Sequence, residues 1–422
     1  CPHVYTQIKA WKIKMMAIPS FKPYLSYKQL NRTLSRLLAG SIPEQAGGAT
    51  FEREFARYLG VKHAIRVPSA RWGLYYILKG LNLKEGDEVI LPAFNYFAVP
   101  AAILKLGLRP VFVDIAAGNM NIDTEKIKEN ITQRTRAVIA THLCGFVCVL
   151  DEILDICRKY NITVIEDCVQ SLGAEYKGKK AGSWGHFSYF SFGVTKHFTT
   201  LGAGMVTTSD DKMADIIRSS IDAIRPVSRK ALLFELVKGY IMKFATSPVM
   251  FPAAHCFMKA FSFFDVDIVD YIFREKEILP AAQPKNGRLN NIQAELGIEQ
   301  LSCLDRENEL RMKNGMELYN GLNGIPNIRI PILESSAKNI FSSCPVFVKD
   351  KRNMRRKLLA KGIDASAGYM KDCSGLGIFS SSMKYCTNAS KAEEEVLYLP
   401  LYAELGHREI RYIKEKIREI CR

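Results

Sequence analysis

The sequence predicts an α/β fold with a large, mainly parallel sheet, followed by a smaller α/β segment. Between residues 50 and 210, apolar strand-like runs alternate with helical patterns. The expected strands are 88–91, 110–115, 137–142, 163–167, 189–192 and 204–208, and the expected helices lie near 73–81, 97–107, 123–131 and 149–160. This alternation is typical of βαβ units. Ligands of such sheets bind at the carboxyl ends of the strands, so the residues after each run are the candidates for a site.

Length and composition limit the class of protein. A chain of 422 residues is longer than one small domain and suits a domain of about 250 residues plus a smaller one. The 48% hydrophobic and 24% charged content excludes wholesale disorder. No run reaches about 18 uninterrupted apolar residues, which argues against a membrane-spanning helix. The eleven cysteines form no CxxC pair, and the seven histidines show no ligand spacing. We therefore expect a reducing compartment, no disulfide framework and no metal.

The N-terminal 40 residues form a basic segment within a chain of net charge +16. They hold seven Lys and Arg, no Asp or Glu, and several interleaved aromatic residues. Three interpretations are open: a solvated extension, an arm that binds anionic lipid, and a nucleic-acid arm. No recognition motif supports the third. We expect a basic arm over residues 1–40 and no nucleic-acid partner.

Residues 226–275 interrupt the strand–helix alternation. An apolar helix is expected over 231–244, and prolines at 248 and 252 break the helical pattern beyond it. A second apolar cluster comes next, made of Phe257, Met258, Phe261, Phe263 and Phe264. Each half is too short to span a bilayer. The segment is interpreted either as an in-plane membrane element or as a helical insertion packed on its own chain or on a dimer partner.

The remaining segments give the expected domain division. A helical pattern over about 286–320 has an apolar face typical of a core or dimer interface. A smaller α/β segment follows and ends in a basic amphipathic helix over 407–422. The expected units are therefore 1–40, 41–285 with the apolar insertion, and 286–422.

Two blocks that follow strands carry groups suited to catalysis. The run 164–170 places Asp167 at the carboxyl end of an apolar strand, although an aspartate there is equally typical of a helix cap. About 29 residues later, the strand-and-turn block 188–196 presents Lys196. A lysine so placed can form a Schiff base with an aldehyde, although most lysines after strands are merely solvated. Together, the two blocks favour a shared site more strongly than either block does alone.

A third block predicts an anion site. A strand ends at Pro68, and a helix is expected just after Ser69. Backbone amides at a helix N-terminus bind anions, and Ser69 and Arg71 add side-chain donors. Serine is also a common N-cap, so the block alone is weak.

Taken in order, these blocks resemble the DegT/StrS family of pyridoxal-phosphate-dependent sugar aminotransferases. The resemblance runs from about residue 18 to the C-terminus. Besides the three blocks, it is carried by Phe51–Ala56, Gly86–Pro92, Pro110–Asp114, Asn286–Leu289, Gln293–Ala294 and Tyr398–Leu401. It implies the PLP-dependent transferase fold of type I, as in aspartate aminotransferase, and pyridoxal 5'-phosphate as cofactor.

The resemblance assigns two catalytic residues. Lys196 corresponds to the Schiff-base lysine, which also moves the proton between the substrate carbon and the cofactor carbon. Asp167 corresponds to the partner of the pyridine nitrogen and keeps that nitrogen protonated.

The resemblance also assigns the cofactor-binding set. Tyr96 corresponds to the aromatic residue that stacks on the ring, and Gln170 to a contact of the ring hydroxyl. The phosphate ligands correspond to Ser69, Ser191 and the amides of Ala70 and Arg71. Asn286 or Arg288 corresponds to a segment that reaches the phosphate from a neighbouring subunit, which implies a homodimer with shared sites.

The chain departs from the family pattern in three places. Ser-Gly-Thr reads Ser69-Ala70-Arg71, so Arg71 binds either the cofactor phosphate or a phosphate of the substrate. Gly-Glu-Gly-Gly after the lysine reads Leu201–Gly204, which removes a carboxylate. The insertion at 226–275 is longer and more apolar than usual. For His142, which ends a strand near the site, we favour a structural or pocket-lining role.

The function implied is transfer of an amino group, with glutamate as the donor, to a keto sugar linked to a nucleotide. Such a reaction serves glycan or secondary-metabolite biosynthesis, and the protein is expected to be cytoplasmic. Three alternatives stay open. One is a lipid-linked or lipid-like keto substrate, with the protein attached to the inner face of the membrane. Another is a cofactor-dependent dehydratase, in which the family replaces the lysine with histidine; here His197 only adjoins Lys196. The last is a non-catalytic cofactor-binding sensor.

Overall fold

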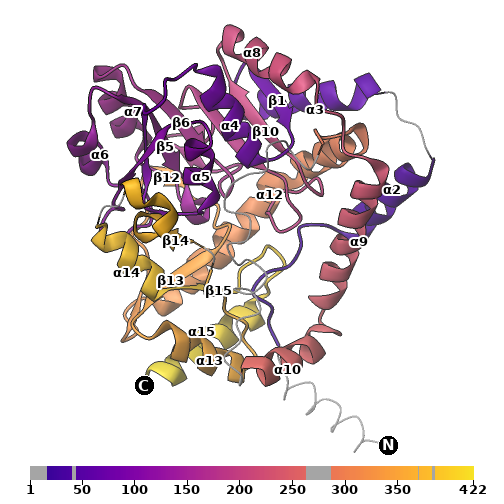
Figure 1. Cartoon of the computed structure of the whole chain (residues 1–422). Helices are drawn as coiled ribbons and strands as arrows, with labels where there is room; N and C mark the ends of the chain where they lie inside the picture. The colour runs from indigo at the N-terminus through magenta and orange to yellow at the C-terminus, as the bar shows by residue number, and fades with distance from the viewer. Residues whose placement is uncertain (1–16, 40–43, 263–286, 369, 383–384) are drawn as a thin grey trace, which may run out of the picture.

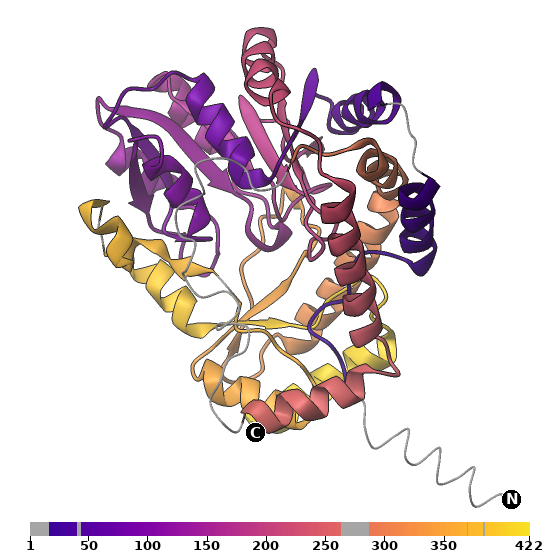
Figure 2. The same ribbon diagram turned by 45° about the vertical axis from the view of Figure 1, so that its right-hand side comes forward.

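The computed structural model describes residues 17–39, 44–262, 287–368, 370–382 and 385–422. Of the sequence-based expectations, those for Phe263, Phe264, Asn286 and the first 16 residues fall outside this part of the chain. Figures 1 and 2 show a large sheet with helices on both sides and a smaller group of strands and helices below it.

The large sheet has seven strands in the order β1-β10-β9-β6-β5-β2-β4. Five neighbouring strands, from β9 to β4, are parallel, whereas β10 runs antiparallel to β9 and β1. All six expected runs are strands here. The bounds are β1 His63–Val67, β2 Glu88–Pro92, β4 Arg109–Val113, β5 Thr135–Thr141, β6 Thr163–Asp167, β9 Phe187–Ser191 and β10 Gly204–Thr208.

Both faces of this sheet are buried, as the near-continuous apolar runs predict. Side chains alternate between two apolar clusters along each strand. On β6, Val164 packs into one cluster and Ile165 into the other, and Met205 and Val206 do the same on β10. The helices that surround the sheet are α3 Glu44–Leu59, α4 Ala70–Gly80, α5 Ala98–Leu104, α6 Thr124–Asn130, α7 Leu150–Lys159 and α8 Asp211–Asp222.

A long helix leads to the smaller part. Helix α12, Asn291–Leu322, begins with a capping box in which the side chains of Asn290 and Gln293 each accept from the other's backbone amide. It precedes a three-stranded antiparallel sheet of β11 Ile328–Arg329, β13 Cys344–Val348 and β15 Val396–Leu399. Helices α13 Lys351–Ala360, α14 Thr387–Glu395 and α15 His407–Cys421 complete this part. The proposed boundary at residue 285 remains a prediction.

Short elements connect the two parts. Strand β14, Lys371–Asp372, pairs with β3, Phe94–Asn95, immediately before Tyr96. Strand β12, Ala337–Lys338, pairs with the hairpin of β7 Glu175–Tyr176 and β8 Lys179–Lys180. Three 3-10 turns lie at Leu143–Gly145, Cys373–Gly375 and Gly377–Ser382. The segment before Tyr96 is therefore held by both parts of the molecule.

Residues 17–39 are packed on the body of the protein, so for them the interpretation as a solvated extension is wrong. Ile18 exchanges backbone hydrogen bonds with Gly362 and Asp364, at 2.8 and 3.0 Å. Leu25 is buried, as is Leu30 of helix α2, Tyr27–Ala39. The leucines can pack while basic groups stay at the surface, since the side chains of Arg32 and Arg36 are each 53% exposed.

The described part of the insertion forms two helices, α9 Arg229–Ala245 and α10 Phe251–Ser262. Figure 1 shows α9 along the right-hand edge with α2 beside it, and α10 at the lower end. Leu232 and Leu236 of α9 pack with Leu25 and Leu30. Among the described helices, none is both long and apolar enough to cross a membrane.

Candidate active site

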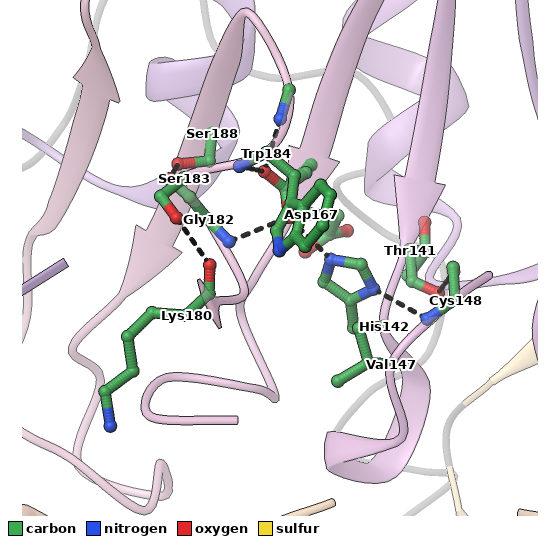
Figure 3. Close-up of polar contacts among 12 residues, drawn as sticks. Thr141, His142, Val147, Cys148, Asp167, Lys180, Gly182, Ser183, Trp184 and Ser188 are labelled. Atoms are coloured by element: carbon green, nitrogen blue, oxygen red, sulfur yellow. Dashed lines mark hydrogen bonds and ion pairs between the residues drawn. The ribbon is translucent and has the colours of Figure 1, made fainter. Parts of the chain in front are cut away.

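Two adjacent carboxylates, Glu166 and Asp167, end strand β6, and both are buried. Glu166 is fully paired within the chain. Its Oε1 accepts from the amides of Trp184 and Gly185 at 2.8 and 2.7 Å, and its Oε2 accepts from the amide of Gly182 at 2.7 Å. Figure 3 shows this loop folded around the end of β6. Glu166 therefore fixes the loop 182–185, and its charge has no capacity left for a ligand.

His142 completes this network. Its Nε2 donates to Glu166 Oε2 at 3.1 Å, and its Nδ1 accepts from the amide of Cys148 at 3.2 Å (Figure 3). Cys168 lies beside the pair, and the three ligand-type atoms are within 4.8 Å of one another. Both ring nitrogens and both carboxylate oxygens already have partners, so the cluster has the character of a closed polar network. The structural role favoured for His142 fits this geometry.

Asp167 is less well paired than its neighbour. Its Oδ1 accepts from the amide of Val169 at 3.1 Å. Burial raises the pKa of Asp167, while the Tyr189 hydroxyl, the Val169 amide and the charges of His142 and Lys196 lower it in part. Strand pairing sets Tyr189 directly opposite Asp167. A buried carboxyl with a raised pKa is suited to a cationic partner, which would restore its ionised form.

Lys196 lies in a compact loop after β9. Its amide donates to Gly193 O at 2.9 Å, and Phe192 O accepts from the amides of Thr200 and Gly202 at 3.1 and 2.9 Å. The Lys196 side chain is half-buried, and it is close enough for its charge to lower the pKa of Asp167. The fold thus brings together the two catalytic candidates that the sequence separates by 29 residues.

The residue after the lysine takes no part in a dehydratase-like arrangement. His197 Nε2 donates to Leu172 O at 3.2 Å, which directs the ring to the loop that follows β6. Burial lowers the pKa of His197 to about 3, with a further contribution from the nearby charge of Arg311. His197 is therefore neutral across the physiological range and is occupied by a structural hydrogen bond.

The expected phosphate ligands lie where β1 and β9 end and β10 begins. Ser69 caps helix α4, its Oγ accepting from the amide of Trp72 at 3.4 Å. On the neighbouring strands, Gly204 pairs with both Val67 and Ser191. A Cβ at Gly204 would lie 2.4 Å from Phe190 O and 2.9 Å from the Ala70 nitrogen. This close backbone approach, which only glycine permits, sets the first amides of α4 beside the end of β9, an arrangement that would form a cradle for an anion.

Gln170 and Tyr96 flank the same strand ends. Gln170 Oε1 accepts from the amide of Cys144 at 2.9 Å, which fixes the side chain so that its NH₂ group is the end that can donate to a ligand. Tyr96 follows β3, is half-buried, and has its ring centroid 4.6 Å from that of Phe97. Asn95 Oδ1 accepts from the Tyr96 amide at 2.7 Å and holds the turn.

Arg288 lies in a different place. A backbone bridge joins it to Pro226, and its side chain lines a pocket of about 160 Å³ with Glu52, Arg66 and Arg218. None of the other expected cofactor-binding residues lines that pocket. Within one chain the structure therefore does not unite Arg288 with Lys196. A role in a neighbouring subunit's site remains a prediction.

Two features of the lysine loop escaped sequence reasoning. Leu201 and Ala203 have left-handed φ angles of +60° and +67°, at positions where the family pattern has glycine. Leu201 is buried and packs with Leu232 and Leu236 of α9. The departure from glycine was visible in the sequence, but its packing partner lies more than 30 residues away. The proximity of Tyr189 to Asp167 was also missed, because only strand pairing sets the middle of β9 opposite the end of β6.

Comparison with known proteins identifies the class. The DegT/DnrJ/EryC1/StrS aminotransferase family matches residues 32–244 and 268–418, so the chain belongs to this family. The resemblance inferred from the motifs is thereby confirmed.

Two curated relatives carry names of sugar enzymes. The GDP-perosamine synthase of Caulobacter vibrioides is 42% identical over 168 residues, 40% of this chain and 45% of that protein. The dTDP-3-amino-3,6-dideoxy-alpha-D-galactopyranose transaminase of Aneurinibacillus thermoaerophilus is 38% identical over 203 residues, 46% of this chain and 56% of that protein. The matched stretches span about half the length of these relatives.

A solved structure, that of DesV from S. venezuelae, has a TM-score of 0.75 at 22% identity and covers 96% of this chain and 98% of its own. The likeness confirms the expected fold class.

Proposed function

We propose that this protein is a pyridoxal-phosphate-dependent aminotransferase that moves an amino group from glutamate to the keto group of a nucleotide-linked sugar, in glycan or secondary-metabolite biosynthesis. The observation that carries the proposal is the meeting of buried Asp167, half-buried Lys196 and the α4–β9 anion cradle at one edge of the sheet. The names of the relatives support a nucleotide-linked sugar as the acceptor.

The residues present fit the cofactor. Pyridoxal phosphate, when bound, supplies an aldehyde that condenses with amines and a ring that draws electrons from the reacting carbon. Asp167, whose pKa is raised by burial and whose Oδ1 accepts from the Val169 amide, would hold the proton on the pyridine nitrogen. Gln170, fixed by the Cys144 amide, would donate to the ring hydroxyl, and Tyr96 would cover the ring.

The phosphate would be held by the amides of Ala70 and Arg71 and by the Ser191 hydroxyl. The dipole of helix α4 favours an anion there. The Arg71 guanidinium replaces the family's threonine hydroxyl and would add a full positive charge to the cradle. Arg71 would thereby make up for a neutral hydrogen bond with a charge-assisted one.

Lys196 would be the proton carrier. Its Nζ would take the proton from the substrate carbon and return it to the cofactor carbon, as a positioned amine does in general acid–base catalysis. The loop 192–203, closed by hydrogen bonds to Phe192 O, would keep this amine in place, and Asp167 would hold the ring.

The test is spectroscopic and kinetic. Purified protein given pyridoxal phosphate should gain an absorbance band near the visible edge, and glutamate should bleach it. Lys196→Ala should abolish multiple turnover, while Lys79→Ala, an exposed lysine on α4, should leave it unchanged. Multiple-turnover transamination by Lys196→Ala would refute the assignment. Cofactor binding by the wild type without transamination of any keto sugar would favour a sensor.

We also propose a homodimer in which Arg288 completes the partner's site. Its position in a pocket that none of the other cofactor-binding candidates lines supports this arrangement. Mixing Lys196→Ala chains with Arg288→Ala chains should restore activity, because one site of the heterodimer then has both residues. A fully active monomer at low concentration would contradict the shared site.

The second candidate acceptor is a keto substrate carried on a lipid, used at the cytoplasmic face of a membrane. The exposed apolar side chains of helix α9 favour it. Assaying the same purified protein with a soluble nucleotide-linked keto sugar and with a lipid-linked one separates the two acceptors.

A further inference from the structure

We propose that the outer face of helix α9, continued by α10, is a surface that binds anionic lipid and seats the protein in the plane of a membrane interface. The inference concerns a surface of this chain and goes beyond the proposed reaction, which requires no lipid. It starts from the two apolar faces of α9, Arg229–Ala245.

The inner face of α9 explains how the helix is held to the protein. Leu232 and Leu236 are fully buried, and a Cβ at Gly239 would lie 3.2 Å from Leu30 Cδ2 and 3.4 Å from Leu201 Cδ2. The fold therefore uses this face alone, and the opposite face is not needed for packing within the described chain.

The outer face is apolar as well, and it is exposed. Phe234 is 69% exposed, Ile241 62% and Phe244 57%, and Leu233 and Val237 are 43% and 46% exposed. Spacings of three and four residues place these side chains on one stripe of the helix. A contiguous apolar stripe of this kind marks an interaction site more often than scattered surface residues do.

The stripe continues beyond α9. Val249, in the turn after the helix, is 82% exposed, and Phe257 on α10 is 59% exposed. Figures 1 and 2 show α9 and α10 following one another along the outside of the molecule. The family match stops at residue 244 and resumes at 268, so α10 falls in a stretch of this chain that the family match does not cover.

The charges around the stripe select an anionic partner. From residue 229 to 262 the sequence has five Lys and Arg and one acidic residue, Glu235. Lys243 is set apart from the border, because its side chain is only 15% exposed and pairs with Glu404 at 3.4 Å. Lys230 lies on the exposed side, and Lys238 pairs at 3.7 Å with Glu235 while its side chain stays 48% exposed. A basic border around an apolar helix face is the pattern of helices that lie at the surface of anionic membranes.

The same charges disfavour a second copy of this chain as the occupant. A twofold contact brings the same patch of both copies together, so a patch with a net positive border would meet a second patch of the same sign. Such like-charge contact opposes association, whereas lipid phosphates would neutralise it. Lipid is therefore the occupant that matches both the apolar stripe and its border.

This seating has a consequence for the active site. The inner face of α9 touches Leu201 in the lysine loop, and a helix is about 10 Å thick. Lipid on the outer face would thus lie about one helix diameter from that loop. The lysine loop would then lie at the depth of the lipid headgroups, where it could meet a keto substrate that has a lipid carrier.

The experiment is flotation of the full chain, loaded with cofactor, with two kinds of vesicle. Vesicles of phosphatidylcholine mixed with phosphatidylglycerol should carry the protein upward at low salt, and vesicles of phosphatidylcholine alone should carry less. Ile241→Glu should lower the partition coefficient about tenfold, because it places a charge in the apolar stripe. Ile332→Glu is the matched control, since Ile332 is 66% exposed but lies outside the insertion.

A second pair of variants tests the border. Lys238→Gln should lower partitioning about fivefold on anionic vesicles. Its control is Lys128→Gln on α6, because Lys128 is 47% exposed and also pairs with a glutamate three residues away. The proposal fails if the wild type stays in solution with anionic vesicles at low salt, or if each variant floats like its control.

The oligomeric state and activity distinguish the remaining outcomes. If Ile241→Glu dissociates a wild-type oligomer in sedimentation and the wild type does not float, the stripe is a protein interface and the proposal is wrong. Turnover of a soluble nucleotide-linked keto sugar should be the same for wild type and Ile241→Glu. If neither the wild type nor Ile241→Glu transaminates, the proposed function is wrong, whereas the proposed lipid-binding surface is unaffected.

Discussion

The carboxyl end of β6 and the outer face of α9 both depart from the usual distribution of residues, in which charged groups are exposed and apolar groups are buried. At β6 two carboxylates, Glu166 and Asp167, are buried, whereas on α9 Phe234 and Ile241 are more than half exposed. Charged groups normally stay in water and contiguous apolar stripes normally do not. What differs is compensation. Glu166 is fully paired, Asp167 partly, and the apolar stripe of α9 has no cover within the described chain. Asp167 and the apolar stripe, which the chain does not fully cover or pair, indicate ligand sites. Glu166, which is fully paired, has a structural role.

Glu166→Ala tests the fully paired carboxylate, and we expect it to have the largest effect. The substitution leaves three backbone amides and His142 without their acceptor in the interior. We expect a loss of about 3–5 kcal/mol in the free energy of unfolding, as when one partner of a buried charged network is removed. Urea unfolding followed by circular dichroism measures it. A loss below about 1 kcal/mol would mean that water replaces the carboxylate and that the network is not structural.

Substitutions on the two faces of α9 should differ in their effect on the free energy of unfolding. Leu236→Ala removes a fully buried side chain and should cost about 2–4 kcal/mol. Ile241→Ala, on the exposed stripe, should change the unfolding free energy by less than about 0.5 kcal/mol. Thermal and urea unfolding of both variants, without lipid, provide the measurement. Equal costs would show that the outer face is covered in solution.

His197 should make the fold sensitive to acid. Burial lowers its pKa to about 3, against about 6.5 in the unfolded chain, so below pH 6.5 the unfolded state binds the proton first. Stability is then lost as the pH falls from about 6.5 towards 3, with about 2 kcal/mol lost by pH 5 from this group. His197→Gln, which can still donate to Leu172 O, should flatten that slope. Parallel pH–stability curves for the two proteins would contradict a buried neutral ring.

Asp167 should act with the opposite pH dependence. Its pKa is raised by burial, so the folded state holds the proton over a range where the unfolded state, with a pKa of about 3.9, has lost it. Its contribution to stability therefore declines as the pH rises above about 4 and stays low above the raised pKa. Asp167→Asn keeps an acceptor for the Val169 amide but does not titrate, so it does not lose stability as the pH rises.

We expect the cofactor-free Asp167→Asn protein to be slightly more stable than wild type at neutral pH, with the difference vanishing in acid, and to be inactive. Melting temperatures across pH, with a transamination assay, measure the two effects. Reduced stability at neutral pH would show that the carboxylate is already compensated within the chain.

The sequence by itself determined what depends on local pattern and residue type. Alternating apolar runs predicted the strands, because a doubly buried strand must be apolar throughout. The placement of Asp167 and Lys196 just after two such runs predicted a shared edge, because parallel strands end on the same side.

The tertiary structure alone decided which apolar face of α9 is buried and which carboxylate is paired. Apolar side chains surround most of α9, so its periodicity cannot show that Leu232 and Leu236 face Leu30 while Ile241 faces outward. Glu166 and Asp167 are adjacent in sequence and equally acidic. They differ because the turn at 182–185 delivers its amides to one and the loop of Lys196 approaches the other. Such long-range contacts form only when the strands have paired, and neither residue type nor spacing encodes them.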